Sequence, residues 1–251
     1  MLGLDKQFAD IDLAGNWCNE DAATSSLMEA VSFVTPVLEN HFIRTVGEAL
    51  KGRAPSELER RCRSFIREES IHSRIHKKFN AQLLANLGRT PPGLAAVATL
   101  LDSTKHWLSL RNRLLLAAAL EHFAAVISKG YVAQQAQLEF RSAFARELFA
   151  QHAQEELAHR SVVFDLWLSN GTARCLGRVF ILLAILAIGV GYFAVAMTWI
   201  LYRKHGNRWP ATLAALAGFA LKHVFSANTY APIPEVFSFM RRHYHPDQLA
   251  D

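Results

Sequence analysis

Two stretches of this sequence place a histidine three residues after a glutamate: Glu69 precedes His72, and Glu156 precedes His159. Residues three or four apart share one face of an α-helix, so each stretch would present a carboxylate and an imidazole side by side. His152 falls within the same narrow arc as Glu156 and His159. Two helices that each carry Glu-x-x-His supply half of a carboxylate-bridged two-metal site in a helical bundle.

The other half of such a site is one glutamate on each of two further helices, and Glu39 and Glu121 are the candidates. Glu121 interrupts the apolar run from Leu114 to Ile127, where a carboxylate is costly unless it is paired or bound to a metal. Along the chain a lone glutamate is followed by Glu-x-x-His, and this order then occurs a second time. Such an order is expected when two helix hairpins each contribute half of the site.

Charge and ligand type point to iron. Two divalent ions bring four positive charges into a bundle core, and four carboxylates would cancel them, whereas neutral imidazoles add none. Carboxylate oxygen with imidazole nitrogen suits iron or manganese, and structural zinc more often uses cysteine. The sequence therefore predicts two iron ions, with manganese as the alternative metal and dioxygen as a co-substrate. The predicted metal ligands are Glu39, Glu69, His72, Glu121, His152, Glu156 and His159.

Other titratable residues near these motifs receive different assignments. Glu68 and Glu155 lie about 100° around the helix from the proposed ligands, so we expect them to be solvated or to contact the ligands from outside. His76 lies one turn beyond His72 on the same face and is an outer ligand or a hydrogen-bonding neighbour. His41 and His122 point elsewhere and are expected to be surface or core histidines.

Helical periodicity and capping residues predict the elements that position the site. Apolar residues recur at three and four from Leu27 to Val46, with Pro36 as a kink or a restart. Ser56 and Glu59 form a capping-box pattern for a second helix that ends at Gly88.

A long helical region contains the third helix, and a fourth spans 136–168 and ends at Asn170-Gly171. No strand pattern interrupts these segments. The fold class is therefore all-α, a ferritin-like four-helix bundle over residues 1–172 followed by a hydrophobic helix or helix pair and a polar tail over 173–251.

The extension after the bundle is long enough to cross a bilayer. Residues 179–202 carry no charge and are flanked by basic residues, and a bilayer needs ~20 apolar residues. The alternatives are a helix buried in the protein or two short helices bent at Gly189 and Gly191, while 211–221 is too short to span alone. We expect membrane contact through 179–202.

Composition narrows the class and the compartment. The 251 residues are 51% hydrophobic with a net charge of +5, and no basic run alternates with aromatic residues, so nucleic-acid binding is not expected. Cys18, Cys62 and Cys175 lack Cys-x-x-Cys spacing, which indicates thiols in a reducing compartment. Residues 1–13 do not resemble a secretory signal, so we expect a cytoplasmic protein attached to the inner face of the membrane.

Several motifs together resemble a known family. The sequence is similar to the bacterial predicted metal-dependent hydrolases, which implies a metal-binding helical bundle, in these segments: Phe65 to His76, Ala119-Leu120-Glu121-His122-Phe123, His152 to Asp165, and His243-Tyr244-His245-Pro246-Asp247. The ligand pattern also resembles that of the di-iron p-aminobenzoate N-oxygenases, in which a third histidine one turn before the last Glu-x-x-His completes the site. His152 matches that position, and this resemblance is the reason to count it as a ligand.

Three functions compete on this ligand set. The first is a di-iron enzyme that activates dioxygen to hydroxylate, desaturate or N-oxygenate a small or lipid-like substrate. This function needs an external electron donor as a partner, and a homodimer is a possible assembly. The second is hydrolysis of an ester or phosphoester by two metals. Helical hydrolases of that kind use a His-Asp dipeptide as ligands, and this chain has none. The third is a non-catalytic iron-binding bundle, which the apolar segment 179–202 disfavours because storage proteins of this type are soluble.

Overall fold

The computed structural model describes residues 13, 15–171, 175–223 and 233–249. Within this part of the chain the regular elements are helical, and one isolated β-bridge joins Cys18 to Phe140. The helices are α1 (Ala22–Ala49), α2 (Glu57–Leu87), α3 (Leu94–Trp107), α4 (Leu110–Gln134), η3 (Gln135–Gln137), α5 (Ala143–His159), α6 (Val162–Ser169), α7 (Cys175–Lys204), α8 (Trp209–His223), α9 (Ile233–Ser238) and η4 (Pro246–Leu249). The all-α prediction is confirmed.

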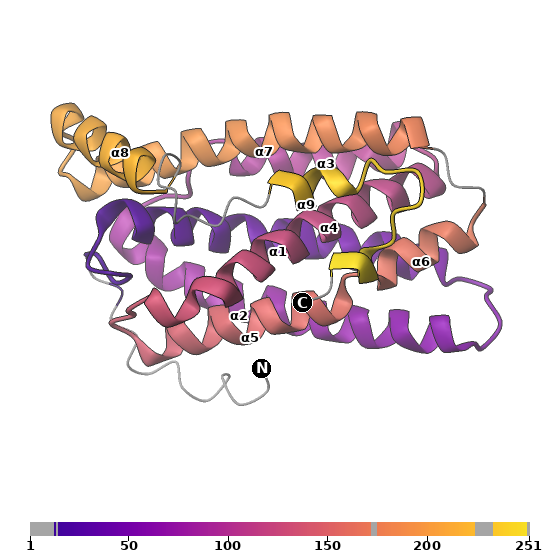
Figure 1. The fold of residues 1–251 in the computed structure, drawn as a ribbon. Helices are drawn as coiled ribbons and strands as arrows, with labels where there is room; N and C mark the ends of the chain where they lie inside the picture. Colours follow the sequence, from indigo (N-terminus) through magenta and orange to yellow (C-terminus); the bar gives the residue numbers. More distant parts are fainter. Residues whose placement is uncertain (1–12, 14, 172–174, 224–232, 250–251) are drawn as a thin grey trace.

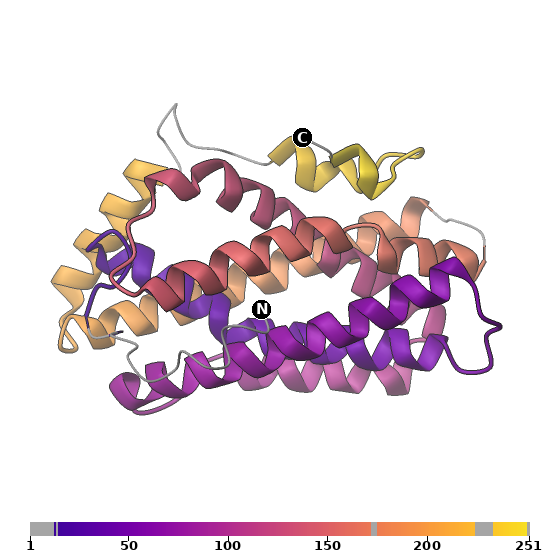
Figure 2. The same ribbon diagram turned by 90° about the horizontal axis from the view of Figure 1, so that it is seen from below.

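Four long helices form the bundle. α1 packs on α2 and on α4, and α4 packs on α5, so the predicted ligand-bearing helices surround one interior. Figures 1 and 2 show α3 and α7 alongside these helices, and the C-terminal segment with α9 lying over α4. The bundle architecture expected from the sequence is confirmed.

Local capping sets both ends of α2, as predicted. The Ser56 hydroxyl accepts a hydrogen bond from the backbone N–H of Glu59 at 3.1 Å. Gly88 ends the helix in the left-handed region with φ 77°, and its N–H donates to the Leu84 carbonyl at 2.8 Å. A glycine adopts this conformation without the strain that a Cβ would add.

α1 is one continuous helix through Pro36, so the alternative of a restart at this proline is wrong. A proline has no N–H, and the carbonyl four residues earlier, that of Ser32, loses its usual partner. The side-chain amide of Asn80 on α2 donates to this carbonyl at 2.9 Å. The helix also begins earlier than the apolar pattern indicated, because Asp21 caps it by accepting from the Thr24 N–H at 2.6 Å.

Two expected helices are divided. The long third region splits into α3 and α4, because the Ser109 hydroxyl caps a new helix by accepting from the Asn112 N–H at 3.3 Å. The fourth starts at Ala143 rather than 136, since Ser142 caps it and residues 138–141 form an extended connection with the β-bridge. Its C-terminal part is separated by Ser161 into the short helix α6.

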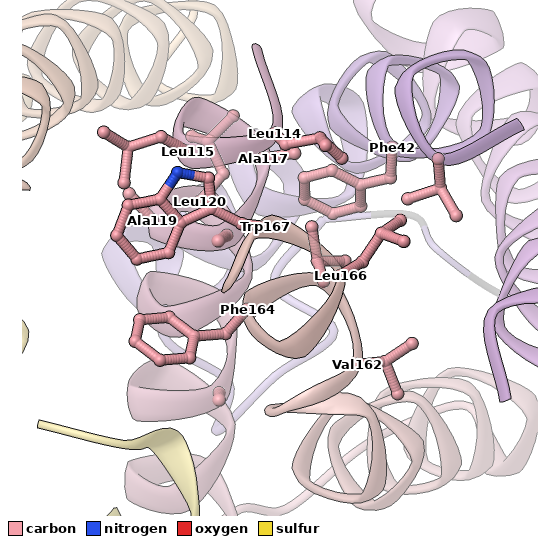
Figure 3. Packing of buried hydrophobic residues seen from close by; sticks show 14 of the residues in the cluster. Phe42, Leu114, Leu115, Ala117, Ala119, Leu120, Val162, Phe164, Leu166 and Trp167 are labelled. Carbon is pink, nitrogen blue, oxygen red and sulfur yellow. The ribbon is translucent and has the colours of Figure 1, made fainter. Parts of the chain in front are cut away.

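A hydrophobic core fills the end of the bundle where α4 meets α6 (Figure 3). Trp167 and Phe164 of α6 are buried against the alanine-rich segment of α4 that includes Ala117 and Ala119. Small alanine side chains on α4 leave room for these large rings, and burying a large apolar side chain stabilises the fold by about 1.5–3 kcal/mol.

The hydrophobic extension is a single helix, α7, without a break at Gly189 or Gly191. It lies along α1 and α4 and is followed by α8 (Figure 1). Two helical stretches are long and apolar enough to cross a membrane: Leu110–Gln137, 61% buried in the bundle, and Leu176–Lys204, only 22% buried. The expected boundary between residues 172 and 173 lies outside the described residues, and the division into two units stays a prediction.

Candidate metal centre

The seven predicted ligands come from four helices and meet inside the bundle. Their side chains originate on α1 (Glu39), α2 (Glu69, His72), α4 (Glu121) and α5 (His152, Glu156, His159). The glutamates are almost inaccessible to solvent, with Glu69 and Glu121 at 0% exposure. Helical spacing accounts for this convergence, because each Glu-x-x-His pair projects from one face of its helix.

Six of the seven residues form two adjacent groups. Within each group, one ligand atom per residue lies within 4.8 Å of the others: Glu39 with His72 and His152, and Glu69 with Glu156 and His159. The Nδ1 atom of His72 is 3.9 Å from a Glu39 oxygen and 3.8 Å from a Glu156 oxygen, so the groups adjoin each other. These two buried Glu/His groups suggest a binuclear metal site.

Glu121 is outside both groups but belongs to the same electrostatic cluster. Burial raises the pKa of its carboxyl well above the ordinary value, and repulsion from Glu156, Glu69 and Glu39 raises it further. The pKa values of Glu39 and Glu156 are raised for the same reasons, first by burial and then by neighbouring carboxylates. Without a cation, these acids resist ionisation, whereas bound cations would offset both the burial and the repulsion.

The buried polar atoms at this centre lack ordinary hydrogen bonds. Both carboxylate oxygens of Glu39 and of Glu121 have no hydrogen-bond partner. The same holds for one oxygen each of Glu69 and Glu156, and for Nδ1 of His72 and of His152. Buried polar groups are normally satisfied, and leaving one unpaired costs about 1–3 kcal/mol. Oxygen and imidazole nitrogen are donors that divalent transition metals accept, so the residues present fit two metal ions.

Two further glutamates hold the histidines from outside, in a crosswise arrangement. Glu155 of α5 hydrogen-bonds Nε2 of His72 on α2, and Glu68 of α2 hydrogen-bonds Nε2 of His159 on α5 at 2.6 Å. An Nε2–H that donates to a carboxylate leaves the Nδ1 lone pair for a metal, and it raises the basicity of the ring. Of the two alternatives expected for Glu68 and Glu155, which were solvation or contact with the ligands from outside, this geometry agrees with the second.

The sequence carries a further signal for this arrangement, beyond the spacing of glutamate and histidine. Each Glu-x-x-His is directly preceded by another glutamate, so both helices share the longer pattern Glu-Glu-x-x-His. The first glutamate of each pattern reaches the histidine of the other helix. Helix periodicity alone cannot reveal such a contact, because it depends on how α2 and α5 pack.

We expect Glu68→Ala and Glu155→Ala each to weaken metal binding by about 10–100-fold, since each removes the carboxylate that orients a ligand histidine. Competition against a chelator of known affinity measures the change. Glu147→Ala is the matched control, because Glu147 lies at an exposed position of α5, where its carboxylate accepts a hydrogen bond from the Gln151 side chain at 2.8 Å. Unchanged affinity in both variants would contradict the orienting role.

His76 is a neighbour of the centre. Its Nδ1 pairs with the Ser32 hydroxyl at 2.9 Å, and its ring lies 4.9 Å from that of His152. Burial and the charge of His72 lower its pKa to about 3, which keeps the ring neutral. His122 lies in the core, where it pairs with the Val236 carbonyl at 3.0 Å and the Tyr244 hydroxyl at 2.7 Å.

Metal-free protein should lose stability as the pH rises from about 6.5 to 9. The folded-state pKa of His159 is raised from 6.5 to about 9 despite its burial, because of hydrogen bonds and charges from Glu69, Glu156 and Glu68. The carboxyl pKa values of Glu39 and Glu156 are also raised, from 4.5. A raised folded-state pKa contributes stability that is complete below the unfolded value and is lost as the pH passes the folded value. Both sets therefore act in the same direction here.

Thermal unfolding of chelator-treated protein at several pH values in this range measures the effect. The lowered pKa of His152 acts in the opposite sense, but only below its ordinary value of 6.5. Metal-loaded protein is the control, and its Tm should depend less on pH because cations replace the protons. A metal-free Tm that is constant or rises over the range would contradict the raised pKa values of His159, Glu39 and Glu156.

One comparison with known proteins gives a match. The model of a family described as predicted metal-dependent hydrolase matches residues 4–250, a range that includes every residue of the centre. Neither a curated protein nor a solved structure matches the chain.

Proposed function

We propose that this chain, which belongs to the predicted metal-dependent hydrolase family, is a di-iron enzyme that uses dioxygen to oxidise a small or lipid-like substrate. The observation that carries the proposal is the set of four buried glutamates with unpartnered oxygens beside three histidines. A carboxylate-rich set of this kind compensates two divalent cations and is typical of di-iron proteins built in helical bundles.

Two separate groups of residues would each bind one metal ion. One metal would be held by Glu39, His72 and His152, and the other by Glu69, Glu156 and His159. Glu121 would supply the fourth carboxylate charge from α4. Iron, when bound, supplies the redox chemistry that reduces dioxygen and oxidises the substrate, and manganese would accept the same ligands.

The surroundings support reactions that exclude water. The ring of Phe65 meets that of His159 edge-on at 5.1 Å, and Phe149 meets His76 at 5.8 Å. Such apolar walls lower the local polarity and limit side reactions with solvent. Inserting one oxygen atom of dioxygen into a substrate and reducing the other to water consumes two electrons and two protons. We therefore propose an external electron donor as a partner.

Two-metal hydrolysis of an ester or phosphoester is the second candidate, and the description of the family favours it. In that reaction the metals would lower the pKa of a bound water and stabilise the leaving oxygen. The lack of a His-Asp dipeptide and the seven proposed protein ligands, which would leave less room for a hydrolytic water, are the reasons to rank it second.

Metal analysis of protein purified without oxygen, followed by optical and Mössbauer spectra before and after exposure to dioxygen, tests the proposal. Two irons per chain with a spectrum that changes on exposure supports oxidation. Zinc or manganese with no response to dioxygen would overturn it, and ester and phosphoester cleavage would be assayed next.

Replacing His152 by alanine should change the spectrum or the dioxygen reactivity of a di-iron centre while most metal stays bound. His152 is one of three imidazoles, and Glu39 and His72 of its group remain in the variant. The rate of reaction with dioxygen in stopped-flow mixing is the measurement, with metal content as the control. An unchanged oxygen reaction would mean that His152 is only a neighbour of the site.

A further inference from the structure

We propose that the outward face of α7 is a membrane-docking surface that lies flat on a bilayer containing anionic lipids. The α7 face that points away from the bundle is exposed to solvent: Leu176 is 74% exposed, Phe180 72% and Val190 66%. We define the outward face by these large residues: Leu176, Phe180, Leu183, Ile188, Val190 and Val195. The surface is separate from the metal centre, and the proposal does not depend on the chemistry there.

The pattern of exposure on α7 is unusual for a water-facing helix. Exposed positions recur at three and four from Leu176 to Val195, and each of them carries an apolar residue or glycine. A surface helix normally presents polar side chains on the face opposite the core. A contiguous apolar patch of this extent marks an interaction site, and from Leu176 to Val195 it extends over about 30 Å at a helical rise of ~1.5 Å per residue.

Charge indicates that the partner is a lipid surface. Residues 175–223 contain neither aspartate nor glutamate, while Arg203, Arg208 and Lys222 lie near the end of α7 and on α8. Basic residues beside an apolar helix face are attracted to anionic headgroups. A protein partner would instead require a polar rim with hydrogen-bonding groups, which the outward face lacks at its exposed positions.

Aromatic rings gather at the same basic end. Tyr202 of α7 and Trp209 of α8 have ring centroids 4.7 Å apart, and the guanidinium of Arg89 lies 5.3 Å from the ring of Trp199. Tryptophan and tyrosine concentrate at the boundary between acyl chains and water, because each combines an apolar ring with a polar group. This end of the surface therefore matches the headgroup level of a bilayer.

The helix lies on the bilayer rather than across it. Its inner face packs into the bundle, where Leu182, Ile185 and Ile200 are core residues and the Tyr192 hydroxyl donates to the Ala30 carbonyl at 3.0 Å. If α7 crossed the membrane in this packing, the bundle would enter the bilayer with it. The exposed basic residues of α2, among them Arg67, would then face acyl chains at a high cost.

Vesicle co-sedimentation of the full chain tests the docking surface. The probes are phosphatidylcholine vesicles with and without about one third phosphatidylglycerol. We expect binding to the anionic vesicles, and roughly tenfold weaker binding for the double variant Phe180→Ser with Val190→Ser, because it removes two exposed apolar groups. Ile127→Ser is the matched control, since Ile127 is a 40% exposed apolar residue of α4 and is not one of the α7 residues that define the outward face. Far-UV circular dichroism and metal content verify that each variant is folded.

A second double variant separates the electrostatic attraction to anionic lipids from the insertion of apolar side chains. Arg203→Gln with Arg208→Gln should reduce binding to anionic vesicles and make it less sensitive to salt. No binding of the wild-type chain to either vesicle, or equal binding of the apolar double variant, would overturn the proposal. A dimer in sedimentation velocity that this double variant abolishes, without vesicle binding, would assign the face to a second copy and also overturn it.

Labelling with a membrane-impermeant maleimide tests the flat orientation. Leu168→Cys precedes α7 and Arg203→Cys follows most of it, and both positions are exposed. The native cysteines Cys18 and Cys62 are buried. Labelling of the wild-type chain measures the background reaction of the native thiols. Both introduced thiols should react from outside sealed vesicles. Protection of only one of them would show that α7 crosses the bilayer.

Discussion

Replacing Glu121 by alanine should remove at least one of two bound metal ions. Both oxygens of this carboxylate are buried without a hydrogen-bond partner, and three other acids of the centre raise its pKa. Its negative charge has a function only if a cation is present, since an uncompensated buried carboxylate is costly. Metal content per chain after gel filtration, determined by elemental analysis, measures the loss.

The metal-free protein should respond to a change at Glu121 in the opposite direction. Glu121→Leu keeps much of the volume and removes the unpaired carboxyl, which should raise the unfolding free energy of metal-free protein by about 1–3 kcal/mol. Glu147→Ala is the control for both measurements because Glu147 is exposed on α5. Two metals retained per chain in Glu121→Ala would exclude Glu121 from the ligand set.

Phe65→Ala should destabilise the protein by about 3–5 kcal/mol, the range measured for truncating a buried phenylalanine. Phe65 on α2 is 1% exposed, and its ring lies 6.2 Å from that of Phe42 and 5.1 Å from that of His159. The variant removes core volume and also a wall against which a proposed ligand packs. Urea unfolding of metal-free and metal-loaded protein measures both effects.

The two forms should respond unequally to Phe65→Ala. Metal-free protein reports the cavity, whereas metal-loaded protein also reports the looser packing of His159 through its metal affinity. Ile127→Ala at a 40% exposed position of α4 should cost much less and serves as the control. A loss below about 1 kcal/mol for Phe65→Ala would show that the core rearranges to fill the space.

Local signals predicted the parts of the fold that depend on neighbours in sequence. The capping serine and the terminal glycine of α2 act within a few residues, so both ends of that helix were predictable. Helical spacing likewise brought each histidine to the face of its glutamate, and the seven proposed ligands do converge on one interior. Their role as ligands stays a prediction.

The features that the sequence did not predict depend on packing between distant segments. The start of α5 at Ala143 follows from the connection that pairs Phe140 with Cys18, more than one hundred residues away along the chain. The crosswise contacts of Glu68 and Glu155 require α2 and α5 to lie side by side in one specific register along their axes. The exposed outer face of α7 cannot be read from hydropathy, which describes both of its faces as apolar.

The side-chain amide of Asn80 on α2 donates to the Ser32 carbonyl, which has no N–H partner because residue 36 is a proline. This hydrogen bond fixes the register of α1 against α2. Sliding one helix by a turn would leave that carbonyl buried and unpaired, so this single contact penalises every shifted alignment of the pair. It also couples the two positions. Changing Asn80 should be harmful while proline is present and far less harmful once an N–H is restored at position 36, which makes the two substitutions non-additive.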